Sequence, residues 1–130
     1  ALGFARRALE EGLRRATTRK MFGHTLADFQ LTQAKLAQMA TEIEASREFT
    51  YRVAAKMAAG QNCIKEVSMA KNFATNVSDR VTYDAVQIFG GSGFMRGTVV
   101  ERLARDNRIL AIGGGTYEIM NEVIAKQMGL

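Results

Sequence analysis

The chain has 130 residues with twelve glycines and no proline. Proline breaks a helix because it lacks a backbone N–H and clashes with the preceding turn, so nothing here forces a break inside a long helix. The main interruptions are two glycine clusters, at residues 90–93 and at Gly113–Gly115. No segment alternates apolar and polar residues for long enough to indicate a strand. The sequence therefore predicts an all-α fold of long helices separated by glycine turns.

Three long segments repeat apolar residues every three or four positions, which is the spacing of one helix face. They cover about residues 1–18, residues 30–59 with a stop at Gly60, and a segment that follows Asn62 and ends at Gly90. The expected apolar faces are Leu2, Ala5, Leu9, Leu13 and Ala16, then Leu36, Met39, Ile43, Thr50, Val53 and Met57, then Val67, Ala70, Ala74, Val77, Val81, Ala85 and Ile88. The two longer helices would each span roughly 40 Å at 1.5 Å per residue, which favours an up-and-down helical bundle.

Shorter elements complete this prediction. Residues 20–29 form a connecting loop in which Asp28 is a candidate N-cap for the second long helix. Thr98 and Glu101 have the spacing of a capping box and begin one or two short helices that reach about residue 110. A last helix runs from Thr116 towards Lys126.

Each glycine cluster has two interpretations. Glycine allows positive φ and close approach of a flat ligand, and Thr116 is a candidate N-cap whose helix would direct N–H groups at a phosphate or a polar ring edge. The alternative is that both clusters are only helix ends and tight turns, and a single cluster taken alone favours this alternative.

Composition indicates one globular domain over residues 1–130, with 47% hydrophobic and 24% charged residues. The net charge of +5 raises the possibility of nucleic-acid binding. However, the basic residues of the first helix are interleaved with Glu10 and Glu11, expected to be solvent-facing ion-pair partners, so we expect no nucleic-acid partner. The single Cys63 cannot form an internal disulfide and has no neighbouring ligands for a metal, which indicates a reducing compartment. His24 is expected to serve in a loop rather than in catalysis.

The sequence carries no long apolar run and no secretory signal, so no membrane span is expected. It begins inside an amphipathic pattern without a starting methionine, and we therefore expect a fragment of a larger protein.

Three motifs occur in order: RKMFGHTLADFQ at residues 19–30, DAVQIFGGSGF at residues 84–94 and RDNRILAIGGGTYEI at residues 105–119. Together they closely resemble the C-terminal helical domain of the acyl-CoA dehydrogenase family, over essentially the whole chain. The resemblance implies a flavoprotein with bound FAD that removes a proton from the α carbon and a hydride from the β carbon of an acyl-CoA thioester. It also implies an electron-transfer flavoprotein as acceptor, and a bacterial cytoplasmic or mitochondrial matrix location.

The resemblance also implies roles for individual residues. Arg19 corresponds to an arginine that contacts the FAD pyrophosphate of a neighbouring subunit, although a solvated helix-end arginine is the alternative. Such sharing implies a homo-oligomer, usually a dimer of dimers. The further implied FAD contacts are Phe22, Gln30, Gln87, Gly90, Gly91, Thr116 and Glu118, and Gly115 is implied to lie near the substrate. Phe22 also suits an ordinary core position, and Arg105 with Asp106 is expected to be a structural pair.

Gly114 stands where many family members carry the catalytic glutamate, and glycine has no side chain to accept a proton. The long-chain and isovaleryl types instead carry this base on the helix before Arg19, near its start, which implies a base upstream of Ala1. We expect no catalytic residue within this chain, and we do not assign Glu10, Glu11 or Glu118 as the base. The space at Gly114 motivates the hypothesis of a long or branched acyl chain.

Two alternatives stay open at this stage. One is a related flavoprotein oxidase, because the pocket would be shared with other domains. The other is a helical assembly module without a cofactor. Whether the whole protein is a dehydrogenase or an oxidase, this chain alone is expected to be inactive.

Overall fold

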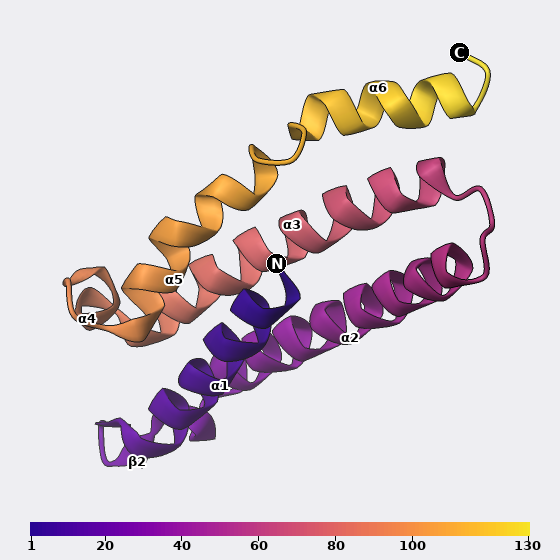
Figure 1. The fold of residues 1–130 in the computed structure, drawn as a ribbon. Helices are drawn as coiled ribbons and strands as arrows, with labels where there is room; N and C mark the ends of the chain where they lie inside the picture. The colour runs from indigo at the N-terminus through magenta and orange to yellow at the C-terminus, as the bar shows by residue number, and fades with distance from the viewer.

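The computed structural model describes residues 1–130, and most of them are helical (Figure 1). The α-helices are α1 (Leu2–Thr18), α2 (Gln30–Ala58), α3 (Ile64–Phe89), α4 (Gly91–Phe94), α5 (Val99–Asn107) and α6 (Tyr117–Gln127). Two 3-10 helices, η1 (Leu26–Asp28) and η2 (Arg108–Ala111), precede α2 and follow α5. The predicted all-α bundle is confirmed. None of the helices is both long and apolar enough to cross a membrane.

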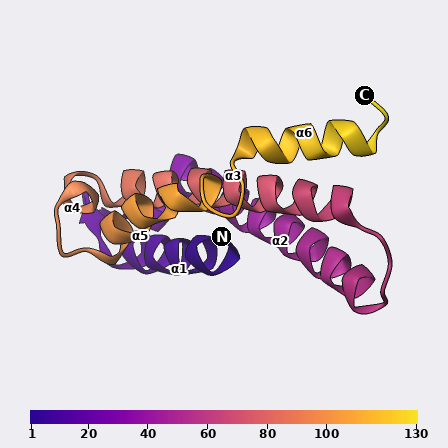
Figure 2. The same cartoon turned by 45° about the horizontal axis from the view of Figure 1, so that its top comes forward.

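The long helices α2 and α3 run antiparallel and are joined by a short turn at Gly60, whose φ is +71°. Helix α1 packs against both of them, while α5 and α6 pack against α3. In both ribbon views α1 lies at the end of the bundle opposite the α2–α3 turn, and α6 lies at the end that holds this turn (Figures 1 and 2). Helix α3 is therefore the scaffold that joins the two ends.

The main core lies where α1 meets α2, α3 and α5. It consists of Ala5, Ala8, Ala16, Leu36, Met39, Ile43, Val77, Val81, Ala85 and Val100. The predicted apolar faces of α2 and α3 are largely confirmed, but Met57 and Val67 lie near the α2–α3 turn and are exposed. Both line an open apolar groove beside Leu2 and Gly3 at the start of α1, which does not cover them.

The packing face of α1 differs from the prediction. Leu13 is 45% exposed, whereas Ala5, Ala8, Gly12 and Ala16 are buried. A Cβ placed on Gly12 would lie 3.4 Å from Ile88 Cδ1 and 3.5 Å from Leu36 Cδ2, so only a small residue suits this position. Helix α1 thus approaches its neighbours through small residues, and its larger Leu13 points away.

Glu11 is a second correction on α1. It was expected to face solvent but is only 4% exposed. Arg7 Nη2 donates to its Oε1 at 2.7 Å, and Arg14 donates to its Oε2 from the other side. The two guanidinium groups reach inward over the helix surface and neutralise the carboxylate, which explains why a charge is tolerated at this buried position. Glu10 is exposed, as predicted.

The face of α3 towards α6 is polar. Ser68, Asn72 and Thr75 are buried there, and the two hydroxyl groups donate to carbonyl oxygens one turn earlier, Ser68 to Ile64 and Thr75 to Lys71, each at 3.0 Å. The hydroxyls of Ser68 and Thr75 are thus satisfied within α3, whereas Asn72 Oδ1 is buried without a partner. These small side chains allow α6 to lie close to α3. Helix α6 itself has no buried residue.

The segment before α2 is more ordered than a loop. Two-residue strands, β1 (Lys20–Met21) and β2 (His24–Thr25), form an antiparallel hairpin. Asp28 is not the N-cap of α2, because Phe29 holds that position. Its carboxylate instead accepts hydrogen bonds from the backbone N and hydroxyl of Thr25, at 2.7 and 2.9 Å. Asp28 thus stabilises the start of η1 instead of the start of α2.

The predicted N-caps at Thr98 and Thr116 are confirmed, but the capping box at Thr98 is only half formed, because the Glu101 carboxylate accepts from Arg105 Nε and not from the Thr98 backbone. Thr98 Oγ1 accepts from the backbone N of Glu101 at 3.3 Å at the start of α5, and Thr116 Oγ1 accepts from Ile119 N at 3.3 Å at the start of α6. The predicted pair of Arg105 and Asp106 also forms, at 2.8 Å.

Candidate functional site

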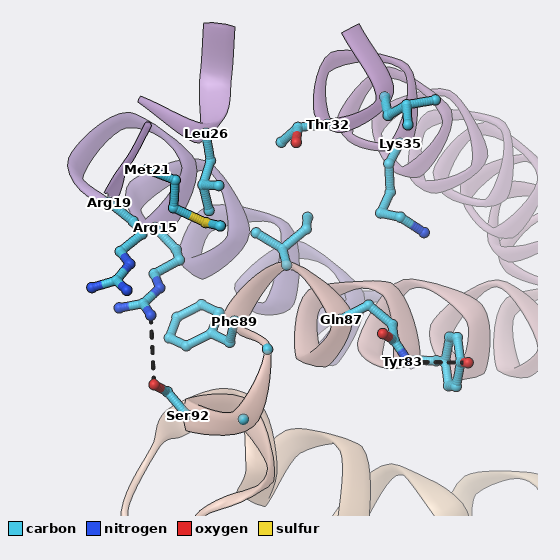
Figure 3. A pocket seen from close by; sticks show the side chains of 14 residues that line it. Arg15, Arg19, Met21, Leu26, Thr32, Lys35, Tyr83, Gln87, Phe89 and Ser92 are labelled. Atoms are coloured by element: carbon cyan, nitrogen blue, oxygen red, sulfur yellow. Dashed lines mark hydrogen bonds between the residues drawn. The ribbon is translucent and has the colours of Figure 1, made fainter. Parts of the chain in front are cut away.

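An open groove of about 780 Å³ lies where the ends of α1 and α3 meet the hairpin and the start of α2 (Figure 3). Four of the residues singled out in the sequence line it, namely Arg19, Gln87, Gly90 and Gly91. The other lining residues are Arg15, Met21, Leu26, Leu31, Thr32, Lys35, Tyr83, Ile88, Phe89 and Ser92. The groove therefore gathers two of the three sequence motifs at one end of the bundle.

Two guanidinium groups stand side by side at one wall of the groove, from Arg15 and Arg19 (Figure 3). Arg15 lies over the Phe89 ring at 5.2 Å from its centroid and donates to Ser92 Oγ at 3.5 Å, while its buried Nε has no hydrogen-bond partner. Arg19 ends α1 and makes no ion pair within the chain. Paired guanidinium groups with unused donors suit a polyanion such as a diphosphate.

The opposite wall comes from the last turns of α3. Gln87 Nε2 donates to Tyr83 Oη at 3.1 Å and leaves its carbonyl oxygen available to a ligand. Lys35 of α2 forms an ion pair with Asp84, so its charge is already compensated. This wall thus offers an amide and a phenol, which recognise polar ring edges rather than phosphates.

Glycines at the end of α3 serve different purposes. Gly90 has φ of 62° and ψ of −144°, a conformation that is open to glycine, and a Cβ on Gly90 or Gly91 would meet nothing within 4 Å. A Cβ on Gly93 would lie 2.7 Å from Val86 O. The helix-end interpretation therefore accounts for the positive φ of Gly90, and close backbone packing accounts for Gly93. Gly90 and Gly91 also leave the groove open beside them.

Two residues of the first motif lie outside the groove. Phe22 is 87% exposed at the tip of the hairpin with φ of 52°, and Gln30 begins α2 with an exposed side chain. The core alternative for Phe22 is wrong, because the hairpin holds the ring away from the bundle. Both side chains project from the same end of the molecule as the groove.

The third motif forms a separate region, which we call the glycine loop, at residues 113–116. Gly114 and Gly115 have φ of 66° and 100°, and a Cβ on Gly114 would meet nothing within 4 Å. The loop lies against Lys71 and Asn72 of α3. These residues precede Gln87 by about 16 positions, which corresponds to roughly 24 Å along a helix. The structure thus does not bring Gly115, Thr116 and Glu118 into the groove.

Glu118 stands in the first turn of α6. The pKa of its carboxyl lies below the usual range because it accepts hydrogen bonds from its own backbone N–H and from the Thr116 side chain, and Arg108 adds a favourable charge. A carboxylate at this helix end is also favoured by the helix dipole. An ionised carboxylate that satisfies a helix end is poorly suited to take a proton from carbon.

Sequence reasoning missed Arg15, Lys71 and Asn72. Arg15 is one turn before Arg19 on α1, so helical spacing could have placed both on one side. Lys71 and Asn72 lie within a long apolar-periodic segment and had no local signal, because their partners lie more than 40 residues later.

Residues 1–129 match the family model described as "Acyl-CoA dehydrogenase, C-terminal domain". An acyl-CoA dehydrogenase of Bacillus subtilis (strain 168) is 44% identical over 128 residues, which cover 98% of this chain and 34% of that protein. A solved structure of a probable acyl CoA dehydrogenase from Mycobacterium abscessus superposes with a TM-score of 0.97 and 48% identity, over 98% of this chain and 34% of that one. The FAD complex of PigA has a TM-score of 0.93 and 29% identity, over 99% of this chain and 34% of that one. The chain thus spans about one third of the length of the curated relative.

Proposed function

The chain belongs to the acyl-CoA dehydrogenase family, and from its match to the C-terminal domain of that family we propose that it is the C-terminal helical bundle of a larger FAD-dependent enzyme. The proposed reaction is α,β-dehydrogenation of an acyl-CoA thioester to the 2-enoyl-CoA. The observation that carries the proposal is the groove, where two guanidinium groups face an amide and a glycine-ended helix.

The donor set of the groove suits the nucleotide half of FAD. Arg15 has a buried Nε without a partner, and Arg19 makes no ion pair, so both can bind phosphate oxygens. Gln87 would bind an adenine or ribose edge, and Gly90 and Gly91 would leave room for it. Phe22 and Gln30, which project near the groove, are proposed to contact the flavin and adenine ends of the cofactor.

The distance between the groove and the glycine loop supports an FAD site that is shared between two subunits. The groove and the glycine loop are roughly 24 Å apart along α3, and Gly113 and Gly114 of the loop are exposed. We propose that one subunit supplies the groove to an FAD whose other contacts, including Thr116 and Glu118, come from a neighbouring copy. The enzyme would then be a homo-oligomer, with a dimer of dimers as the expected form.

No carboxylate of this chain is proposed as the base. Gly114 has no side chain, Glu118 is held ionised at the start of α6, and Glu11 is buried between two arginines. The base is therefore proposed to be a carboxylate elsewhere in the polypeptide, upstream of Ala1. Gly115 would lie beside the substrate, and bound FAD supplies the acceptor for the hydride that leaves the β carbon.

The acyl group is proposed to be long or branched, since the space beside Gly114 is not filled by any atom within 4 Å. Electrons are expected to leave the enzyme through an electron-transfer flavoprotein. A reducing compartment, either a bacterial cytoplasm or the mitochondrial matrix, suits the single buried Cys63.

The test uses the complete protein, purified and mixed anaerobically with acyl-CoA thioesters of different lengths. We expect a bound flavin whose visible absorption bleaches, fastest with long or branched chains. Rapid reoxidation by air would instead indicate an oxidase, and a colourless protein that takes up no FAD would indicate an assembly module and contradict the proposal.

A matched pair of variants locates the cofactor. Arg19→Met is expected to weaken FAD retention about tenfold or more, since it removes a charged hydrogen-bond donor from the diphosphate site. Arg52→Met, an exposed arginine on α2 outside the groove, is the control and is expected to retain FAD normally. Equal retention by both variants would place the diphosphate elsewhere.

A further inference from the structure

Two consecutive residues of α3 hold the glycine loop from beneath. Lys71 Nζ donates a hydrogen bond to the carbonyl oxygen of Gly115. Asn72 Nδ2 donates to the carbonyl oxygen of Tyr117 at 3.1 Å and to Asn121 Oδ1 at 2.9 Å. The backbone on both sides of Thr116 is therefore attached to α3 by side chains.

Few backbone hydrogen bonds restrain this loop. Gly113 N donates to Ile109 O at 2.7 Å, but neither Gly114 nor Gly115 donates a backbone hydrogen bond within the chain. Consecutive glycines have more conformational freedom than other residues, although the Met120 side chain of α6 packs against Gly115, where an added Cβ would lie 2.5 Å from Met120 Cε. The polar contacts that hold the loop to α3 are those of Lys71 and Asn72.

Lys71 also changes the chemistry of the peptide that it contacts. The Gly115 carbonyl and the Thr116 N–H belong to one peptide unit, and an ammonium bound to the oxygen makes the N–H a stronger donor. Thr116 N–H has no partner within the chain. Lys71 forms no ion pair with a carboxylate, so its charge acts on this carbonyl alone.

We propose that Lys71 and Asn72 are positioning residues, which hold the glycine loop in the conformation described here, and that Lys71 strengthens Thr116 N–H as a donor to the bound cofactor or substrate. This inference rests on the proposed function, because the loop matters for the reaction only where it forms a wall of the flavin site. Lys71 and Asn72 act through the loop and are not proposed to contact the reacting atoms.

The experiment uses the full-length holoenzyme and three variants. Lys71→Met removes the ammonium and keeps an unbranched side chain of similar length. Lys71→Arg keeps a charged donor. Lys65→Met, on the same helix, is the control, because the Lys65 side chain makes no hydrogen bond or ion pair. For each variant we would measure hydrogen exchange of the amides of residues 114–117, the melting temperature, and kcat and KM per bound flavin.

Lys71→Met is expected to increase exchange of these amides at least tenfold and to lower kcat/KM about tenfold, mainly through kcat, because a misplaced wall costs alignment in the transition state. Lys71→Arg is expected to recover most of both losses, and Lys65→Met to match the wild type. The proposal is overturned if Lys71→Met leaves exchange unchanged, or if it lowers only the melting temperature while kcat/KM per flavin stays constant.

Failure of the proposed function would look different. A wild-type protein without flavin or without turnover contradicts the proposed function. In that case faster hydrogen exchange in Lys71→Met would still support the attachment of the loop to α3. The proposed role of Lys71 in the reaction would be contradicted.

Discussion

Helices α1 and α6 both pack on α3, at opposite ends of the bundle, but they do so by different means. Helix α1 contributes Ala5, Ala8 and Ala16 to the apolar core, all of them fully buried. Helix α6 has no buried residue and is held through Asn72 and the loop before it. Apolar burial is not directional, whereas hydrogen bonds fix orientation at a modest net gain in stability.

This difference indicates that the two ends of α3 contribute to the structure in different ways. The α1 end supplies most of the stability and supports the groove on a rigid base. The α6 end is held by polar contacts and by half-buried side chains such as Met120 and Ile124, so its separation from α3 should cost less than opening the α1 core. Substitutions at the two ends should therefore differ in the loss of stability that they cause and in how much of the chain is affected.

The largest effect is expected at the α1 end. Met39→Ala removes a fully buried side chain beside Gly12 and should lower the free energy of unfolding by about 2–5 kcal/mol, because a cavity is left in the core. Urea denaturation of the complete protein measures this loss. Met57→Ala on the same helix removes an exposed side chain and should change stability by less than about 0.5 kcal/mol. Equal losses would contradict the central role of the α1 core.

The next effect is local to the α6 end. Asn72→Ala removes two hydrogen bonds and should cost about 1–3 kcal/mol, expressed mainly as faster hydrogen exchange in α6. Amides in α1 and in the first half of α2 should keep their protection. If protection is lost throughout the chain, α6 is part of the main cooperative unit and the comparison fails.

A smaller effect is expected from the helix caps. Thr116→Ala should destabilise the start of α6 by about 1 kcal/mol, since Ile119 N loses its acceptor. Thr98→Ala makes the matched change at α5. Because α5 contributes Val100 to the core and α6 contributes nothing, hydrogen exchange should report more fraying at α6 for the same loss of a cap.

The smallest effect is a dependence on pH. The pKa of Glu118 is lowered in the folded protein, so its contribution to α6 is complete above its unfolded pKa and is lost as the pH falls through the lower folded pKa. Exchange at the start of α6, measured relative to unfolded peptides at each pH, should rise in acid in the wild type. Glu118→Gln should remove this acid-dependent step, and its persistence in that variant would assign the step to another group.

The helices could largely be predicted from the sequence, because apolar spacing and threonine caps are local signals. The exceptions have physical causes. Leu13 was expected inside because leucine is apolar, yet the close approach of α1 admits only small residues such as Gly12. Glu11 was expected outside because a lone carboxylate is costly to bury, yet Arg7 and Arg14 cover it.

The candidate site was only partly accessible to sequence reasoning. The motifs contain Arg19, Gln87 and Gly90, and the structure places these three along one groove. The attachment of the glycine loop could not be foreseen, since Lys71 meets Gly115 only after α3 and α6 have packed together. Interactions between residues distant in the chain leave no periodic pattern at either position.

The hydroxyl and amide groups buried between α3 and α6 have a thermal consequence. Separating these helices exposes only the half-buried apolar side chains of α6, so the heat capacity should rise less than when the α1 core opens. Cooling weakens the hydrophobic contribution and leaves hydrogen bonds largely intact. Near the freezing point of water the two ends of the bundle should therefore become more nearly equal in strength, while moderate warming should release α6 well before the alanine-lined core opens.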